Sequence, residues 1–154
     1  MTAFVLPLVI GLVAGLRSMT APAAVSWASR AGWLDAGSTP LAFFGYAFTP
    51  WVFTALALGE LVIDQLPTTP SRTEPMPFGT RIVVGALCGG AIGASGGALV
   101  TGLVAGIAGA TLGTLGGHAL RARLAAAFGR DRPAALIEDA VAIGGALLVM
   151  VALP

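Results

Sequence analysis

Five apolar stretches, each long enough to cross a lipid bilayer, constrain the fold of this 154-residue chain more than any other feature. They cover about residues 4 to 28, 41 to 66, 79 to 97, 99 to 120 and 134 to 153. A helix rises about 1.5 Å per residue, so roughly 20 apolar residues cross the hydrocarbon core. Because lipid offers the backbone no hydrogen bonds, each stretch is predicted to be a helix.

Composition supports the same interpretation. Apolar residues make up 56% of the chain and charged residues only 10%, with a mean hydropathy of +0.91. A soluble domain of this size has no interior large enough for so much apolar surface. We therefore predict an all-α, polytopic membrane bundle of about five transmembrane helices, forming one domain over residues 1 to 154. The net charge of +1 gives no reason to expect a nucleic-acid partner.

Two features leave the number of full crossings open. Pro22 predicts that the first stretch tilts or breaks, because a proline inside a helix removes a backbone hydrogen bond. The third and fourth stretches are separated only by the uncharged turn at residues 94 to 97, so a re-entrant pair is an alternative there. The first stretch continues to about Ala28, longer than a signal-peptide core, and we expect it to be a retained helix.

The distribution of arginine predicts the orientation in a cell inner membrane. The loops at 67 to 80 and 121 to 133, with their flanks, contain Arg72, Arg81, Arg121, Arg123, Arg130 and Arg132. The opposite side has only Arg30. By the positive-inside rule, both loops and the N-terminus are predicted to be cytoplasmic and the C-terminus to lie outside. Aromatic residues near the loop at 29 to 40 agree with an outer interfacial belt: Trp27, Trp33, Tyr46 and Trp51.

Glycines recur at four-residue spacing in the third and fourth stretches. They are Gly85, Gly89, Gly93 and Gly97, then Gly102, Gly106, Gly109, Gly113 and Gly117. This spacing places small residues along one helix face and lets two backbones approach closely. Tight packing within the bundle or between protomers is the simpler interpretation, and helices that slide or line a narrow path are the alternative. Because five thin helices enclose little space, we expect a homo-oligomer.

A short internal repeat suggests a possible inverted repeat. The sequence Gly-Leu-Val-Ala-Gly occurs at residues 11 to 15 and again at 102 to 106, and an acid-bearing helix follows each copy. With five crossings the two helix pairs would run in opposite directions, as in inverted-repeat transporters. A chance match is the alternative in a chain so rich in glycine, alanine, leucine and valine.

Ionisable residues lie inside the apolar stretches, where an unpaired charge costs at least a few kcal/mol. Glu60 and Asp64 are four residues apart and share one helix face. Glu138 and Asp139 enter the fifth stretch from the same side. The guanidinium of Arg17, midway along the first stretch, is expected to reach down to Glu60.

Two interpretations of these charges remain open. They are either structural ion pairs between helices, or one shared polar cavity that handles a proton, a cation, an anionic solute or a lipid headgroup. Ser18 beside Arg17 resembles a phosphate clamp, although a helical serine often bonds its own backbone. The predicted binding residues are Arg17, Ser18, Glu60, Asp64, Arg72, Arg81, Glu138 and Asp139. We predict no metal site and no cofactor, and His118 is interpreted as interfacial.

The chain resembles a family of bacterial membrane proteins, the domain of unknown function 4126. The residues that carry the resemblance are Gly15-Leu16-Arg17-Ser18 with Pro22, Gly59-Glu60-Leu61 with Asp64, Pro67, Pro70 and Arg72, Gly79 with Arg81, and Glu138-Asp139-Ala140. They extend over nearly the whole chain. The resemblance implies that these charged positions form a signature, and it implies no substrate.

We therefore expect a small transporter or channel with a cytoplasm-facing charged site. The alternative is a structural or scaffold subunit whose ion pairs hold the fold. A membrane enzyme acting on lipid phosphates comes third, because no nucleophile elbow, Cys-His arrangement or phosphate-binding loop occurs. The expected partners are membrane lipids, copies of the same chain and a small ion or anionic ligand.

Overall fold

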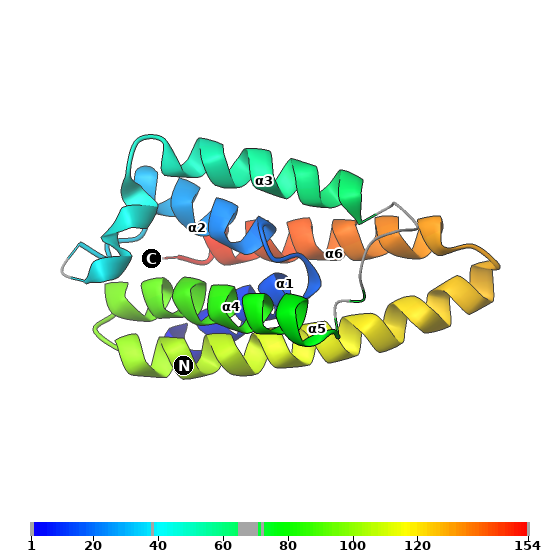
Figure 1. Ribbon diagram of the computed structural model, residues 1–154. Coiled ribbons are helices and arrows are strands. Elements are labelled where there is room, and N and C mark those ends of the chain that lie inside the picture. Colours follow the sequence, from blue (N-terminus) through cyan, green and yellow to red (C-terminus); the bar gives the residue numbers. More distant parts are fainter. Residues whose placement is uncertain (1, 38, 65–70, 72, 154) are drawn as a thin grey trace.

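Helices account for most of the chain in the computed structural model, which describes residues 2–37, 39–64, 71 and 73–153 (Figure 1). The elements are α1 (Thr2–Leu16), α2 (Thr20–Arg30), the 3-10 helix η1 (Pro40–Gly45), α3 (Thr49–Ile63), α4 (Pro75–Ser95), α5 (Leu99–Phe128) and α6 (Asp131–Val151). These residues contain no strand, so the prediction of an all-α fold is confirmed.

Three helices, α4, α5 and α6, are long and apolar enough to cross a membrane. Shorter apolar helices cover Phe4–Leu16 and Thr49–Ile63. These lengths and compositions indicate a membrane protein, with fewer candidate spans among the described residues than the five stretches predicted.

The first stretch, at residues 4 to 28, was predicted to tilt or break near Pro22, and the structure has the break. Helix α1 ends at Leu16, and α2 begins at Thr20. Pro22 is the third residue of α2, where its missing N–H is tolerated, but its ring would clash with the carbonyl of Ser18 in a continuous helix. The chain therefore breaks at residues 17 to 19.

Helix α2 turns back beside α1 and does not continue it. Helix α1 runs in the same direction as α5, because Gly11 lies against Gly106 and Gly15 against Gly113. Helices α2 and α3 run antiparallel, because Met19 contacts Glu60 and Trp27, later in the chain, contacts Thr54, which precedes Glu60. Helix α3 runs in the same direction as α5, because Asp64, which follows α3, contacts Arg121 late in α5. Helix α2 is therefore antiparallel to α1, and residues 2 to 30 form a helical hairpin (Figure 1).

The third and fourth stretches form two long antiparallel helices, each long and apolar enough to cross a membrane. The turn between α4 and α5 includes Gly97, whose φ of +72° favours glycine. Helix α5 continues eight residues past the predicted end at 120, because residues 121 to 128 include no helix breaker. It ends where Gly129 adopts a left-handed conformation.

Glycine lets α5 approach two helices on different faces. A Cβ atom on Gly89 would lie 2.8 Å from the Cα of Gly106, so α4 and α5 are in backbone contact. On another face, a Cβ on Gly109 would lie 2.8 Å from the backbone nitrogen of Leu12 in α1. These separations leave no room for a side chain at either crossing.

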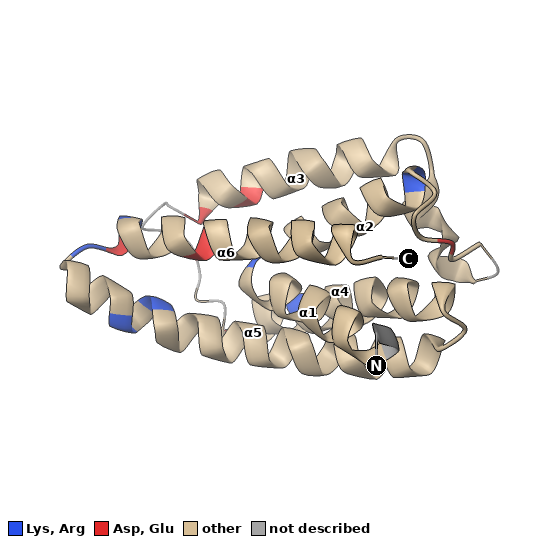
Figure 2. Ribbon diagram, turned by 180° about the vertical axis from the view of Figure 1, so that it is seen from behind, with Lys and Arg blue, Asp and Glu red and all other residues tan. Residues whose placement is uncertain are grey.

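Both chain ends lie at the same end of the bundle in Figures 1 and 2, whereas five crossings would separate them. The extra reversal at residues 17 to 19 accounts for the difference. The suggested inverted repeat is also wrong, because the helices that contain its two copies, α1 and α5, run parallel.

Candidate functional site: a charged centre at the α1–α2 turn

The C-terminal end of α1 is closed by side chains from α4 and α5. The Arg81 Nη1 atom donates hydrogen bonds to the carbonyl oxygens of Gly15 and Leu16, each at 2.9 Å. The Thr114 hydroxyl donates to the Gly15 carbonyl at 3.3 Å and to that of Ala110 at 2.8 Å. A guanidinium is suited to this position because the last carbonyls of a helix have no partners of their own and carry partial negative charge.

The start of α2 is closed by a carboxylate from α3. Glu60 accepts hydrogen bonds from the backbone N–H groups of Ser18 and Met19, both at 2.8 Å. It also accepts the Ser18 hydroxyl at 2.6 Å. An anion suits the N-terminal end of a helix because the first N–H groups have no partners of their own and carry partial positive charge. Because Arg81 Nη2 lies 3.7 Å from Glu60 Oε1, the two groups that close the turn also attract each other.

Arg17, between these two helix ends, is completely buried. Its guanidinium forms ion pairs with Asp64, the residue after α3, and with Asp139 in α6. The predicted contact with Glu60 is wrong, because Glu60 is occupied by the backbone of Ser18 and Met19. Within the described structure, Arg17 Nε and Asp139 Oδ1 are buried without a hydrogen-bond partner, although Asp139 Oδ1 does face Arg17 Nη2.

Arg121 extends the site along α5 toward α6. Its Nε and Nη2 atoms donate to the two carboxylate oxygens of Asp131 at 2.9 and 2.5 Å. Its Nη1 atom lies 3.4 Å from Glu138 Oε2, and Nη2 lies 3.3 Å from the backbone carbonyl of Asp64. Sequence reasoning missed this residue because it assigned residues 121 to 133 to a loop. The helix-forming run that follows Arg121 was the available signal.

We call this group the charged centre: Arg17, Glu60, Asp64, Arg81, Arg121, Glu138 and Asp139. With Ser18, it includes seven of the eight predicted binding residues, which lie on α3, α4 and α6 and directly after α1 and α3. The eighth, Arg72, lies outside the described residues, as do Pro67 and Pro70 of the family resemblance. His118 is exposed. Figure 2 shows the acidic residues of α3 and α6 at the same end of the bundle as the basic residues of α5. Their role in binding remains a prediction.

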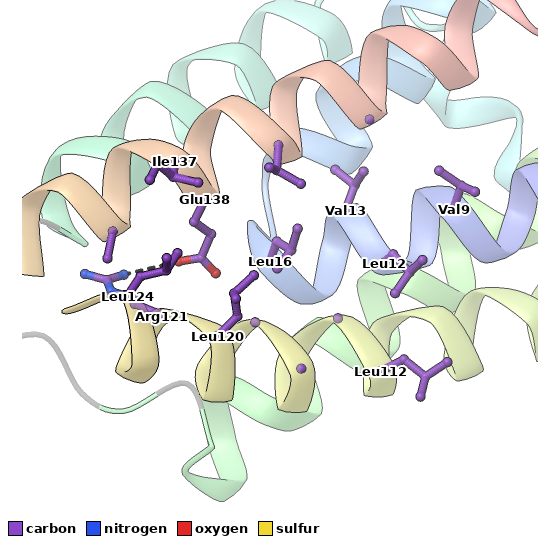
Figure 3. A pocket seen from close by; sticks show the side chains of 16 residues that line it. Val9, Leu12, Val13, Leu16, Leu112, Leu120, Arg121, Leu124, Ile137 and Glu138 are labelled. Carbon is purple, nitrogen blue, oxygen red and sulfur yellow. Dashed lines mark hydrogen bonds and ion pairs between the residues drawn. The ribbon is translucent and has the colours of Figure 1, made fainter. Parts of the chain in front are cut away.

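An apolar groove borders the charged centre (Figure 3). It has a volume of about 350 Å³ and lies between α1, α5 and α6. Its lining is apolar except for Arg121 and Glu138, which lie at one end. The charged side chains contact one another directly, and the groove beside them is apolar.

The charged centre has no arrangement typical of a metal site: the described residues include no group of three or more His, Cys, Asp or Glu side chains suited to hold a metal ion. No protein-family model matches the chain, and no curated protein or solved structure matches it either.

Proposed function

We propose that this chain is a small membrane transporter or channel that conducts protons through the charged centre. The observation that carries the proposal is the reversal of the backbone between α1 and α2 at a buried arginine that two acidic residues share. In membranes, irregular backbone is tolerated only where protein or a polar cavity surrounds it, and transporters use such broken helices to build ion sites. Ionisable residues within membrane-spanning segments are commonly functional.

The shared guanidinium favours a proton over other ligands. Asp64 and Asp139 face the same Arg17 side chain, so protonation of one carboxylate leaves the other as the sole charged partner. A proton needs only one carboxylate oxygen, whereas a metal cation needs several converging ligands. An anionic ligand is less favoured, because Glu60 already occupies the N-terminal end of α2.

For the membrane topology, we propose that α3, α4, α5 and α6 cross the bilayer and that the α1–α2 hairpin is re-entrant. The arginine-rich end, where α5 meets α6, would face the cytoplasm of a cell inner membrane. Trp33, Tyr46 and Trp51 are exposed at the other end, which suits an outer interface. Both termini would then lie outside, and the N-terminus would not be cytoplasmic as the sequence alone predicted.

The test is proton flux into liposomes that contain the purified protein and a trapped pH indicator. Under an imposed pH gradient with the membrane potential clamped, we expect flux above that of protein-free liposomes. Asp139→Asn should abolish the excess while thermal unfolding shows a folded protein. Asp35→Asn is the matched control, since this exposed acid lies outside the charged centre. Wild-type flux equal to that of empty liposomes, or full flux in Asp139→Asn, would contradict the proposal.

A structural subunit is the second candidate, favoured by the direct use of Glu60 and Arg81 to close helix ends. In that case wild-type protein conducts no protons, and Asp139→Asn fails to accumulate in the membrane. Because the wild-type flux is measured first, the two candidates are distinguished even if the variant does not fold.

A further inference from the structure

We infer that the apolar groove between α1, α5 and α6 is a binding site for one acyl chain of an anionic phospholipid, with the headgroup on the arginines at the α5–α6 end. This inference goes beyond proton transport and does not depend on it. Its starting point is the lining of the groove, where a long apolar wall ends at one charged pair (Figure 3). Such a gradient matches an amphiphile with a hydrocarbon tail and a charged head.

The dimensions of the groove suit a single hydrocarbon chain. On α5 the lining runs from Leu112 to Leu124, which is about 18 Å along a helix axis. Over that length the groove has a volume of about 350 Å³. An α-helix with its side chains is about 10–12 Å across, so a helical segment of the same length has a much larger volume, and the groove is too small to enclose a helix from a second copy.

Three aliphatic side chains of the wall are more than half exposed in the described structure. Leu112 and Leu120 of α5 are 59% and 55% exposed, and Val141 of α6 is 55% exposed. A hydrocarbon chain in the groove would pack against α1 as well as these helices, and contact on three sides is more extensive than a flat helix face provides.

Charge complementarity identifies the headgroup as anionic. Arg121, at the end of the groove, is held by Asp131 and Glu138. Three further arginines lie next to these residues in the chain, and all are exposed: Arg123, Arg130 and Arg132. Since Asp131 is engaged with Arg121, the exposed charge at this end is predominantly positive. Clusters of arginine at a membrane surface attract anionic lipid headgroups.

Glycines in the helices allow a matched test of the groove. Gly116 lines the groove, and Gly144 of α6 does not. A Cβ atom on either glycine would meet no heavy atom within 4 Å. Gly116→Leu should therefore fill the groove without displacing a helix, and Gly144→Leu should add the same side chain elsewhere.

The experiment is native mass spectrometry of detergent-purified, delipidated protein titrated with phosphatidylglycerol or phosphatidylcholine of identical acyl chains. We expect wild-type protein to bind one phosphatidylglycerol in preference to phosphatidylcholine. Gly116→Leu should weaken this binding about tenfold or more, because displacing even two methylene groups from an apolar site has an effect of that size. Gly144→Leu should bind as the wild type does.

A second set of variants tests the headgroup. The triple variant Arg123→Gln, Arg130→Gln, Arg132→Gln should bind the two lipids about equally, whereas Arg30→Gln at the other end should keep the preference. Four outcomes would overturn the inference: no bound lipid in the wild type, unchanged binding in Gly116→Leu, equal loss in Gly144→Leu, or a lipid-free dimer that Gly116→Leu converts to monomer. Absence of proton flux in wild-type protein that still binds the lipid would contradict the transport proposal alone.

Discussion

At the scale of single residues, Arg17 has the most demanding environment in the described chain. Its side chain has no exposed surface, and its charge is balanced by Asp64, directly after α3, and by Asp139 of α6. Burial of an ion is unfavourable unless the partner is close, so the three side chains depend on one another. The residue types were apparent from the sequence, but the partner predicted for Arg17 was Glu60, which the backbone of residues 18 and 19 occupies.

Removing the Arg17 charge should destabilise the fold. In Arg17→Gln the two carboxylates lose their common partner, and we expect the free energy of unfolding to fall by about 3–5 kcal/mol. The measurement is SDS-induced unfolding of the purified protein, followed by circular dichroism. Arg30→Gln, at an exposed position, should change the same free energy by less than about 0.5 kcal/mol. Equal free energies of unfolding for the two variants would contradict the buried ion pairs of Arg17 with Asp64 and Asp139.

At the scale of elements, the α1–α2 hairpin and the α4–α5 pair show two ways of providing hydrogen-bond partners for backbone groups without water. The hairpin uses charged side chains to close two helix ends inside the bundle. The α4–α5 pair closes its turn with backbone alone, where the N–H of Ala98 donates to the carbonyl of Gly93, and glycines bring the two helices together. The glycine spacing was visible in the sequence. Which faces it would join was not, because α5 contacts α1 as well as α4.

The close approach of α4 and α5 should be sensitive to one added carbon atom. In Gly106→Ala the new Cβ would lie 2.8 Å from the carbonyl carbon of Gly85, so the helices must separate. We expect the free energy of unfolding to fall by about 1–3 kcal/mol, as for other overpacked contacts. In Gly144→Ala the Cβ has open space, and alanine should stabilise the helix by up to about 1 kcal/mol. SDS unfolding of both variants checks that the two changes in the free energy of unfolding have opposite signs. An unchanged free energy in Gly106→Ala would contradict the close contact between Gly106 and Gly85.

At the scale of the whole molecule, the hairpin changes the relation of the two termini. Sequence reasoning counted one crossing for residues 4 to 28, and this count separated the chain ends. The reversal at residues 17 to 19 adds a change of direction, and the structure has both ends together (Figure 1). The arginine bias between the two ends of the bundle is unaffected, because it depends on the loops and not on the number of passes.

Cysteine labelling tests this arrangement. In intact cells, a membrane-impermeant maleimide should label Ala31→Cys, at the end of α2, and should not label Arg130→Cys, between α5 and α6. The native thiol, Cys88, is fully buried and is replaced by alanine in both variants. Reporter fusions to the N- and C-termini should give the same result as each other. Reporters on opposite sides of the membrane would contradict the structure.

The sequence by itself determined that the chain is helical and apolar, and it identified the charged residues of the centre other than Arg121. It did so because each of these properties depends on residue type and local spacing. The tertiary structure alone decided which guanidinium meets which carboxylate, and that residues 20 to 30 run back beside α1. Pro22 requires a break but not a direction. The direction depends on Glu60 and Arg81, which lie 42 and 65 residues along the chain from the groups they bind.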